Sequence, residues 1–94
     1  MEKQTILLSH RKLVHLGGQL PPYITQKAIQ LCGKIASNTF SLNQLKGKRL
    51  TRNRNYISYS INKNYRVVVK SNQRHHGPYL CLSHADYNHW LKKI

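Results

Sequence analysis

The spacing of hydrophobic residues changes near residue 55 and predicts two differently built halves. The first half carries an apolar stripe whose members recur every three or four residues: Ile24, Ala28, Leu31, Cys32 and Ile35. This is the period of one face of an α-helix. Two prolines at positions 21 and 22 precede the stripe, and proline is well tolerated at the first helical position. We therefore expect a helix that ends near residue 36.

The chain ahead of this stripe predicts a strand and a short helix. Residues 5–9 (TILLS) are an apolar run long enough for a strand and too short for a helix. Ser9 is a good helix cap, and Gly17 and Gly18 are good terminators. A short helix is therefore expected over residues 10–16, forming a hairpin with the helix that follows.

In the second half, β-branched and aromatic residues gather in three runs, at residues 56–61, 65–70 and 78–83. Turn-rich residues 62–64 and 72–77 separate them, which predicts three strands in antiparallel hairpins. A closing helix is expected over residues 85–93. The order β-α-α-β-β-β-α indicates a single α+β domain over residues 1–94, with the N-terminal two-helix hairpin on one face of a small antiparallel sheet.

The net charge of the chain limits the classes of function that it can have. The chain has 16 Lys and Arg but only two acids, Glu2 and Asp86, for a net charge of +14. Such a balance favours a polyanionic partner. A nuclease that uses two magnesium ions needs several carboxylates in one site, and this chain lacks them. If it cuts nucleic acid, the expected substrate is RNA, whose 2′-hydroxyl is an internal nucleophile.

Other site classes are disfavoured. His75 and His76 are adjacent, and Cys81 and His84 follow without the spacing of a zinc site, so neither metal nor cofactor is predicted. Cys32 and Cys81 are expected to be buried thiols. The first residues contain too short an apolar run for a signal peptide or a membrane span, so we expect a soluble cytoplasmic protein with no membrane partner.

One segment concentrates the positive charge. Five of its nine residues are cations: Lys46, Lys48, Arg49, Arg52 and Arg54. No acid lies nearby, so the segment is interpreted as a set of phosphate contacts. The alternative is a solvated basic loop. Phosphate contacts would position a nucleic acid without reading its sequence.

Arg66 differs because it lies inside an apolar strand. Alternation places Arg66, Val68 and Lys70 on one face of that strand, so Lys70 joins the predicted phosphate contacts. An arginine held rigidly on a sheet could stabilise charge on a phosphate. The alternative is an edge arginine that points to water.

His84 and Tyr87 are candidate proton carriers at the start of the closing helix. His84 follows the last predicted strand directly, and an imidazole is well suited to general acid–base chemistry. The alternatives are a histidine that helps to cap the helix and a tyrosine that packs in the core. Trp90 and the remaining tyrosines are expected to be mostly core, with one or two available to stack on a base.

Four short motifs together resemble the RelE/ParE superfamily of toxin–antitoxin toxins. They are LKG at residues 45–47, YSI at 59–61, YRVV at 65–68 and LSHADY at 82–87. The motifs cover roughly the C-terminal half of the chain. Each motif is weak alone, whereas their order and spacing are fairly specific for the superfamily and do not fix its branch.

The resemblance implies two alternative activities. RelE-like members cut mRNA on the ribosome without metal, whereas ParE-like members poison DNA gyrase and cut nothing. By this resemblance, Arg66 would act at the scissile phosphate, His84 and Tyr87 would transfer protons, and Lys46 and Lys48 would contact RNA. It also implies an acidic antitoxin as partner.

The sequence differs from RelE-like nucleases at three positions. Ser58, Ser60 and Asn62 stand where RelE-like nucleases often carry lysine, arginine or glutamate. The first hypothesis is a metal-independent mRNA endoribonuclease that acts with the ribosome. The second is an inhibitor of DNA gyrase, and the third is a basic RNA- or DNA-binding module without catalysis.

Overall fold

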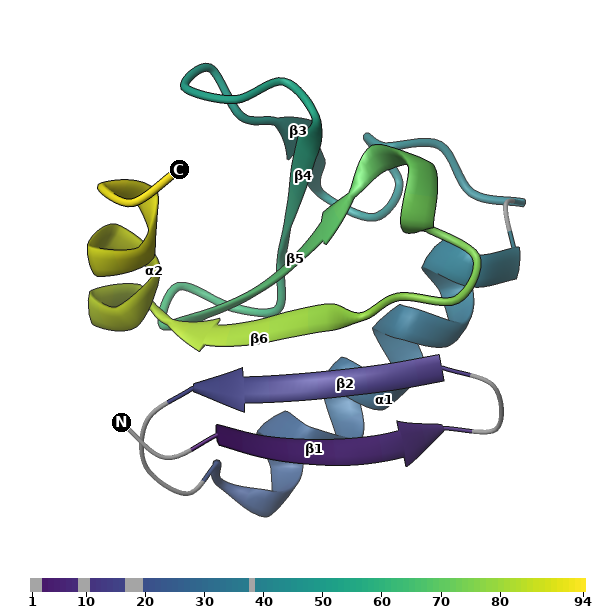
Figure 1. The fold of residues 1–94 in the computed structure, drawn as a ribbon. Coiled ribbons are helices and arrows are strands. Elements are labelled where there is room, and N and C mark those ends of the chain that lie inside the picture. Colours follow the sequence, from purple (N-terminus) through teal and green to yellow (C-terminus); the bar gives the residue numbers. More distant parts are fainter. Residues whose placement is uncertain (1–2, 9–10, 17–19, 38) are drawn as a thin grey trace.

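The computed structural model describes residues 3–8 and 11–16 as backbone, and residues 20–37 and 39–94 with their side chains. Within these ranges, six strands form one sheet in the order β1-β2-β6-β5-β4-β3 (Figure 1). The elements are β1 (Lys3–Leu8), β2 (Arg11–Leu16), α1 (Pro22–Ser37), β3 (Gly47–Arg49), β4 (Tyr56–Ser60), β5 (Tyr65–Lys70), the 3₁₀ helix η1 (Ser71–Gln73), β6 (Tyr79–Ser83) and α2 (His84–Leu91).

The α+β class is confirmed, and from α1 onward the predicted order is found with two additions that were not predicted, the short strand β3 and the 3₁₀ helix η1. Strands β4, β5 and β6 form at the three predicted runs and pair antiparallel. In this register Arg66 lies opposite Ser60 on β4 and opposite Leu82 on β6. The pairing fixes the backbone of Arg66 at the centre of the sheet and not at its edge.

The helix expected over residues 10–16 is wrong, because residues 11–16 form strand β2. This strand pairs antiparallel with β1 and parallel with β6. A helix of about seven residues has too few internal hydrogen bonds to repay its nucleation, whereas a strand between two neighbours gains a ladder on each side. The expected strand over residues 5–9 overlaps β1. Ser9, Gly17 and Gly18 lie outside the described residues.

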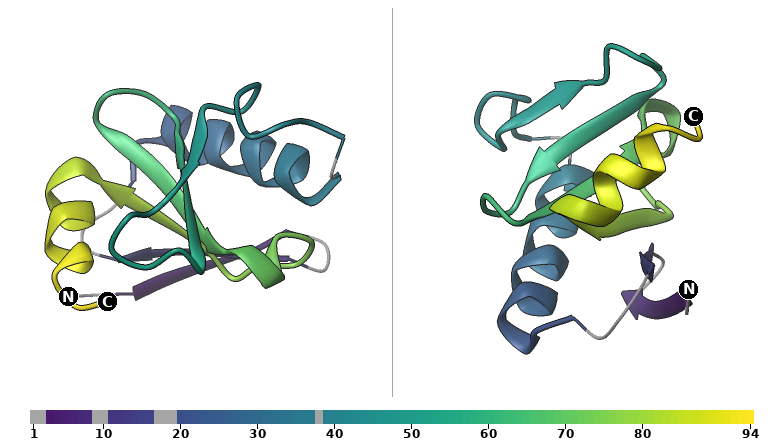
Figure 2. Two further views of the ribbon diagram at one scale, coloured as in Figure 1. Left: turned by 90° about the horizontal axis from the view of Figure 1, so that it is seen from above. Right: turned by 90° about the vertical axis from the view of Figure 1, so that its left-hand side faces the viewer.

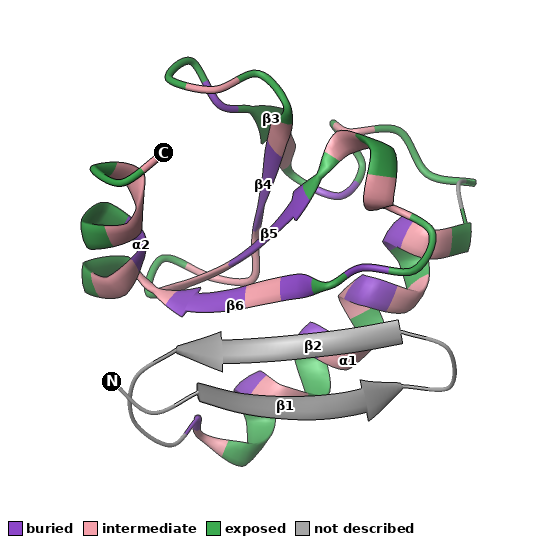
Figure 3. Ribbon diagram, viewed as in Figure 1, coloured by how far each residue is buried: buried purple, intermediate pink, exposed green. Residues whose placement is uncertain are grey.

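The two helices cover opposite faces of the sheet, so a two-helix hairpin on one face is not what forms. In the left-hand view of Figure 2, β4 and β5 run between α2 and α1. Strand alternation explains the division, since Val67 and Val69 contact the α1 side while Val68 contacts the α2 side. Both sides of β5 are therefore buried (Figure 3).

Helix α1 buries its predicted stripe, with Ile24, Ala28 and Cys32 fully enclosed. Cys32 and Cys81 are both buried thiols, as expected. Burial raises the pKa of the Cys81 thiol to about 12. Because the thiolate is the nucleophilic form, Cys81 is inert at neutral pH and belongs to the core.

Ser58 gives a stability prediction. Its side chain is fully buried on the face of the sheet that α2 covers, and its hydroxyl lacks a hydrogen-bond partner among the described residues. An unsatisfied buried hydroxyl costs about 1–3 kcal/mol. Ser58→Ala is therefore expected to raise the unfolding free energy by about 1 kcal/mol, which corresponds to roughly 4–8 °C in the melting temperature.

Ser60→Ala is the matched control for this measurement. The Ser60 hydroxyl donates to the carbonyl of Asn62 at 3.1 Å, so its loss should lower stability by about 0.5–1.5 kcal/mol. Thermal unfolding of both variants measures the difference. A lower melting temperature for Ser58→Ala would show that its hydroxyl has a partner in solution.

Candidate phosphate-binding site

Arg66 and Tyr87 are in direct contact on the α2 side of the sheet. The guanidinium carbon of Arg66 lies 5.1 Å from the centroid of the Tyr87 ring. Tyr87 is only 7% exposed, and its ring also stacks on that of Trp90, with ring centroids 6.2 Å apart. A cation over an aromatic face is attracted by the ring quadrupole. The half-buried guanidinium is thus held in one place before any ligand arrives.

A pocket of about 300 Å³ lies beside this pair. It is lined by two cations, Lys48 and Arg52, and by one wall of Tyr87, and the remaining lining residues are Leu50, Thr51 and Leu91. Because β3 places Lys48 opposite Ser58 on β4, its side chain lies on the α2 side. This pocket brings two members of the basic segment to Tyr87, and none of the described residues that line it carries a carboxylate.

Arg52 also holds the end of the chain. Its Nε donates to the carbonyl of Ile94 at 2.9 Å, and its Nη2 donates to the carbonyl of Lys92 at 3.2 Å. Lys92 is the C-cap of α2, and a cation at the C-terminal end of a helix is stabilising. The basic segment and α2 therefore form one wall of the pocket.

His84 begins α2, one helical turn before Tyr87. Its backbone N–H donates to the carbonyl of Asn64 at 2.7 Å, and its side chain is exposed. The helix cap is Ser83, whose hydroxyl accepts from the N–H of Asp86. A capping role for His84 is therefore not seen. Positions three apart share one side of a helix, which places His84 on the Tyr87 side.

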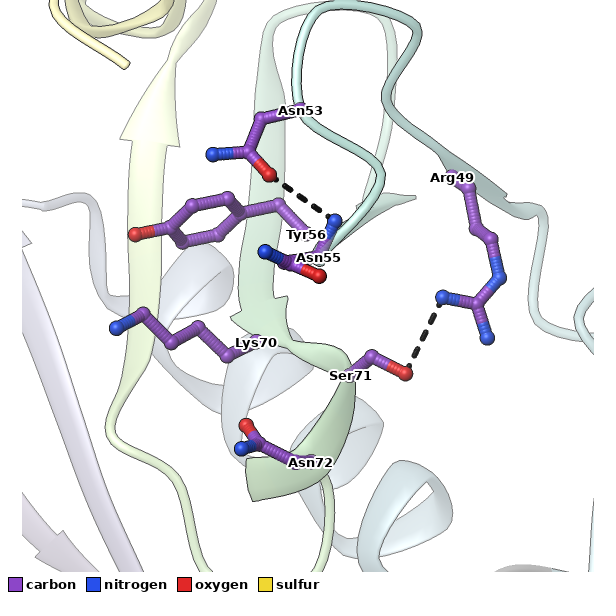
Figure 4. Close-up of a pocket in the computed structure, with 7 residues that line it drawn as sticks. All are labelled: Arg49, Asn53, Asn55, Tyr56, Lys70, Ser71 and Asn72. Atoms are coloured by element: carbon purple, nitrogen blue, oxygen red, sulfur yellow. Dashed lines mark hydrogen bonds between the residues drawn. The ribbon is translucent and has the colours of Figure 1, made fainter.

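The remaining predicted cations lie elsewhere. Arg49 and Lys70 line a second pocket of about 480 Å³ (Figure 4). Lys46 lines a third pocket of about 280 Å³ with Lys27 and Lys34 of α1. Arg54 is exposed. The basic segment is thus not one patch, because strand alternation and the turns around β3 distribute its side chains over different surfaces.

The three positions that depart from RelE-like nucleases have structural roles here. Ser58 is buried in the core, and Ser60 donates to the carbonyl of Asn62. The side-chain oxygen of Asn62 accepts from the backbone N–H groups of Asn64 and Tyr65 at 2.8 and 3.0 Å. Asn62 thus builds the turn between β4 and β5. The cations that could meet a substrate come from β3, β5 and the segment after β3.

Within the described ranges, no group of three or more His, Cys, Asp and Glu is placed to hold a metal ion. Asp86 sits in the first turn of α2, where a carboxylate stabilises the helix dipole. Across the same ranges, no helix is both long and apolar enough to cross a bilayer.

Sequence reasoning missed two features of this surface. The first is an aromatic row in which Trp90 joins Tyr87 to Tyr56, with the Tyr56 and Trp90 centroids 5.1 Å apart. The second is the contact of Arg52 with the chain end. Part of the aromatic row could have been predicted, because Tyr87 and Trp90 are three positions apart in a predicted helix and residues at this spacing are neighbours on its surface. The contact of Arg52 with the chain end could not have been predicted from local sequence, because Arg52 is 40 and 42 positions away from the two residues that it contacts.

The comparisons with known proteins decide the family. A family model described as the ParE-like toxin domain matches residues 22–89, which is most of the chain. The chain belongs to this family. The resemblance to the RelE/ParE superfamily is therefore confirmed: the protein is a toxin of a toxin–antitoxin system, and an antitoxin is its partner. No curated protein and no solved structure matches the chain.

Every part of the site lies within the matched toxin domain. Arg66, His84 and Tyr87 fall between residues 22 and 89, as do Lys48 and Arg52. The strand pair that carries Arg66 and the helix that carries Tyr87 thus belong to the toxin domain itself. The N-terminal strands β1 and β2 precede the match.

Proposed function

We propose that this toxin is a metal-independent endoribonuclease that cuts mRNA on the ribosome. The observation that carries the proposal is the contact of Arg66 with Tyr87 beside a pocket lined by Lys48 and Arg52. These groups offer fixed positive charge and a phenol at one place. Charge fixed in advance stabilises a transition state more than charge that must reorganise.

The reaction would begin with the ribose 2′-oxygen. That oxygen attacks the adjacent phosphorus while His84 accepts its proton. The bond from phosphorus to the 5′-oxygen then breaks, and Tyr87 donates a proton to the departing oxygen. The products are a 2′,3′-cyclic phosphate and a 5′-hydroxyl. Arg66 and Lys48 would neutralise the extra charge on the phosphate oxygens.

The ribosome would supply what the toxin lacks. A ribosome that holds the mRNA in one orientation lowers the entropic part of the activation barrier, which the toxin would otherwise have to overcome. Few catalytic groups then suffice, which agrees with a site of two or three cations, one imidazole and one phenol. A ribosomal target also places the toxin in the cytoplasm.

The test uses purified ribosomes, a defined mRNA and the toxin. Cleavage is expected only with ribosomes present, with product ends that carry a 2′,3′-cyclic phosphate and a 5′-hydroxyl. A single 2′-deoxy nucleotide on the 5′ side of the mapped cut should abolish cleavage there. Cleavage that persists at the 2′-deoxy position, or products with 3′-hydroxyl ends, would refute this chemistry.

Gyrase inhibition is the second candidate. The matched family is ParE-like by description, and Ser58, Ser60 and Asn62 hold the fold where RelE-like nucleases often carry charged side chains. A supercoiling assay with purified gyrase separates the two functions. Inhibited supercoiling together with intact mRNA on ribosomes would favour this candidate.

A further inference from the structure

The residues that line the pocket between Arg49 and Lys70 have no role in the proposed cleavage reaction. Four elements form it: β3, the connection that follows it, the start of β4, and the end of β5 with η1. The described residues that line it supply cations, amides and an aromatic ring, and none of them is acidic: Arg49, Asn53, Asn55, Tyr56, Lys70, Ser71 and Asn72 (Figure 4). Its volume of about 480 Å³ exceeds that of the pocket beside Tyr87.

Hydrogen bonds fix the frame of this pocket. Arg49 donates to the Ser71 hydroxyl at 3.2 Å and to the carbonyl of Arg54 at 3.1 Å. The N–H of Ser71 donates to the carbonyl of Asn55 at 2.7 Å. The Asn53 side chain accepts from the N–H of Asn55 at 3.1 Å. Both walls are therefore in place before a ligand enters.

Inside this frame, several polar groups remain available. The side-chain amides of Asn55 and Asn72 are exposed and make no hydrogen bond within the described residues. The ammonium of Lys70 lies 5.9 Å from the centroid of the Tyr56 ring. An asparagine amide presents a donor and an acceptor side by side, which matches the paired groups on a base edge. Two cations alone would bind any anion, whereas these amides suit a base.

The pocket and Arg66 are connected through strand β5, which carries both Lys70 and Arg66. Arg66 and Lys70 stand on the same face of β5, four residues and thus about 13 Å apart. The aromatic row connects the two positions, since Tyr87 contacts Trp90 and Trp90 contacts Tyr56. Val68, which lies between Arg66 and Lys70 on this face, is buried under α2, so a strand held at Arg66 would pass around α2 to reach the pocket.

We propose that this pocket is a nucleotide subsite for the RNA strand whose cleavage Arg66 promotes. Lys70 binds the phosphate of a nucleotide, and the amides of Asn55 and Asn72 contact its base. Paired asparagine contacts favour adenine. The inference depends on the proposed nuclease function for the identity of the strand, while the base contact itself is a matter of binding.

The test measures binding without cleavage. The probes are 2′-O-methyl pentanucleotides, which lack the nucleophilic hydroxyl: an adenine homopolymer, a uracil homopolymer and an abasic strand with the same phosphates. Trp90 is the sole tryptophan and contacts Tyr56 of the pocket, so its fluorescence reports occupancy. The adenine strand is expected to bind about tenfold more tightly than the abasic strand.

The double variant Asn55→Ala with Asn72→Ala should bring adenine binding close to the abasic level and leave abasic binding unchanged. The control, Asn43→Ala with Asn88→Ala, removes two exposed amides outside the pocket and should change neither. The proposal is overturned if the abasic strand binds as tightly as the adenine strand. It is also overturned if the pocket variant weakens all three strands alike, which would indicate a surface for any polyanion, such as an acidic antitoxin segment.

These outcomes are independent of the cleavage assay. Base-dependent binding that the pocket variant abolishes, in a toxin that cuts nothing on ribosomes, would retain the subsite and reject the nuclease. Cleavage by a toxin that binds all three strands equally would retain the nuclease and reject the subsite.

Discussion

Replacing Arg66 by alanine is expected to lower the rate of mRNA cleavage by about 10²–10³ and to abolish growth arrest. The guanidinium is fixed over Tyr87, and its strand is paired on both sides. The positive charge of Arg66 therefore does not have to be repositioned when the transition state forms. Cleavage rates on purified ribosomes measure the effect.

Two variants separate this loss from a general loss of charge. Lys63→Ala removes an exposed cation from the turn between β4 and β5 and should leave the rate nearly unchanged. Arg66→Lys keeps the charge but loses the planar guanidinium that lies over the ring and binds phosphate in two places, so it should rescue the rate only in part. The fold and the antitoxin affinity of each variant are measured alongside. An Arg66→Ala variant as active as Lys63→Ala would remove Arg66 from the mechanism.

The strands around Arg66 were predictable because their signals are local. Residues 56–61 and 65–70 carry β-branched and aromatic side chains between turn residues, and such patterns favour strands. The stripe on α1 was predictable for the same reason. Residues 11–16 were not, because a short run with both polar and apolar residues suits a helix or a strand. Its neighbours decided the outcome, and β6 lies more than 60 positions later in the chain.

The site itself was only partly predictable. Alternation correctly placed Arg66 with Val68 and Lys70 on one face. It could not show that the two helices lie on opposite faces, and that arrangement brings Tyr87 under Arg66. Nor could it show that Lys46 and Lys48 separate, since the turn before β3 sends Lys46 toward α1. Charge density indicated phosphate binding, and only the tertiary structure divides the cations among pockets.

Replacing Tyr87 by phenylalanine is expected to lower the cleavage rate by about 10²–10⁴ if its hydroxyl is the general acid. Phenylalanine keeps the ring that lies under Arg66 and against Trp90. The change therefore removes the proton donor while preserving the position of the guanidinium. Thermal unfolding should show a small difference, because the ring provides most of the buried surface.

The substrate can distinguish the acid from a group that only positions Arg66. In an mRNA with sulfur in place of the bridging 5′-oxygen at the cut, the leaving thiolate needs little protonation. Tyr87→Phe should then cleave this substrate nearly as fast as the unmodified toxin, whereas His84→Ala and Arg66→Ala should remain slow on it. If sulfur instead rescues His84→Ala, the two proton-transfer roles are exchanged and His84 is the acid. If it rescues neither variant, the proton donor comes from the ribosome or water, and Tyr87 is not the general acid.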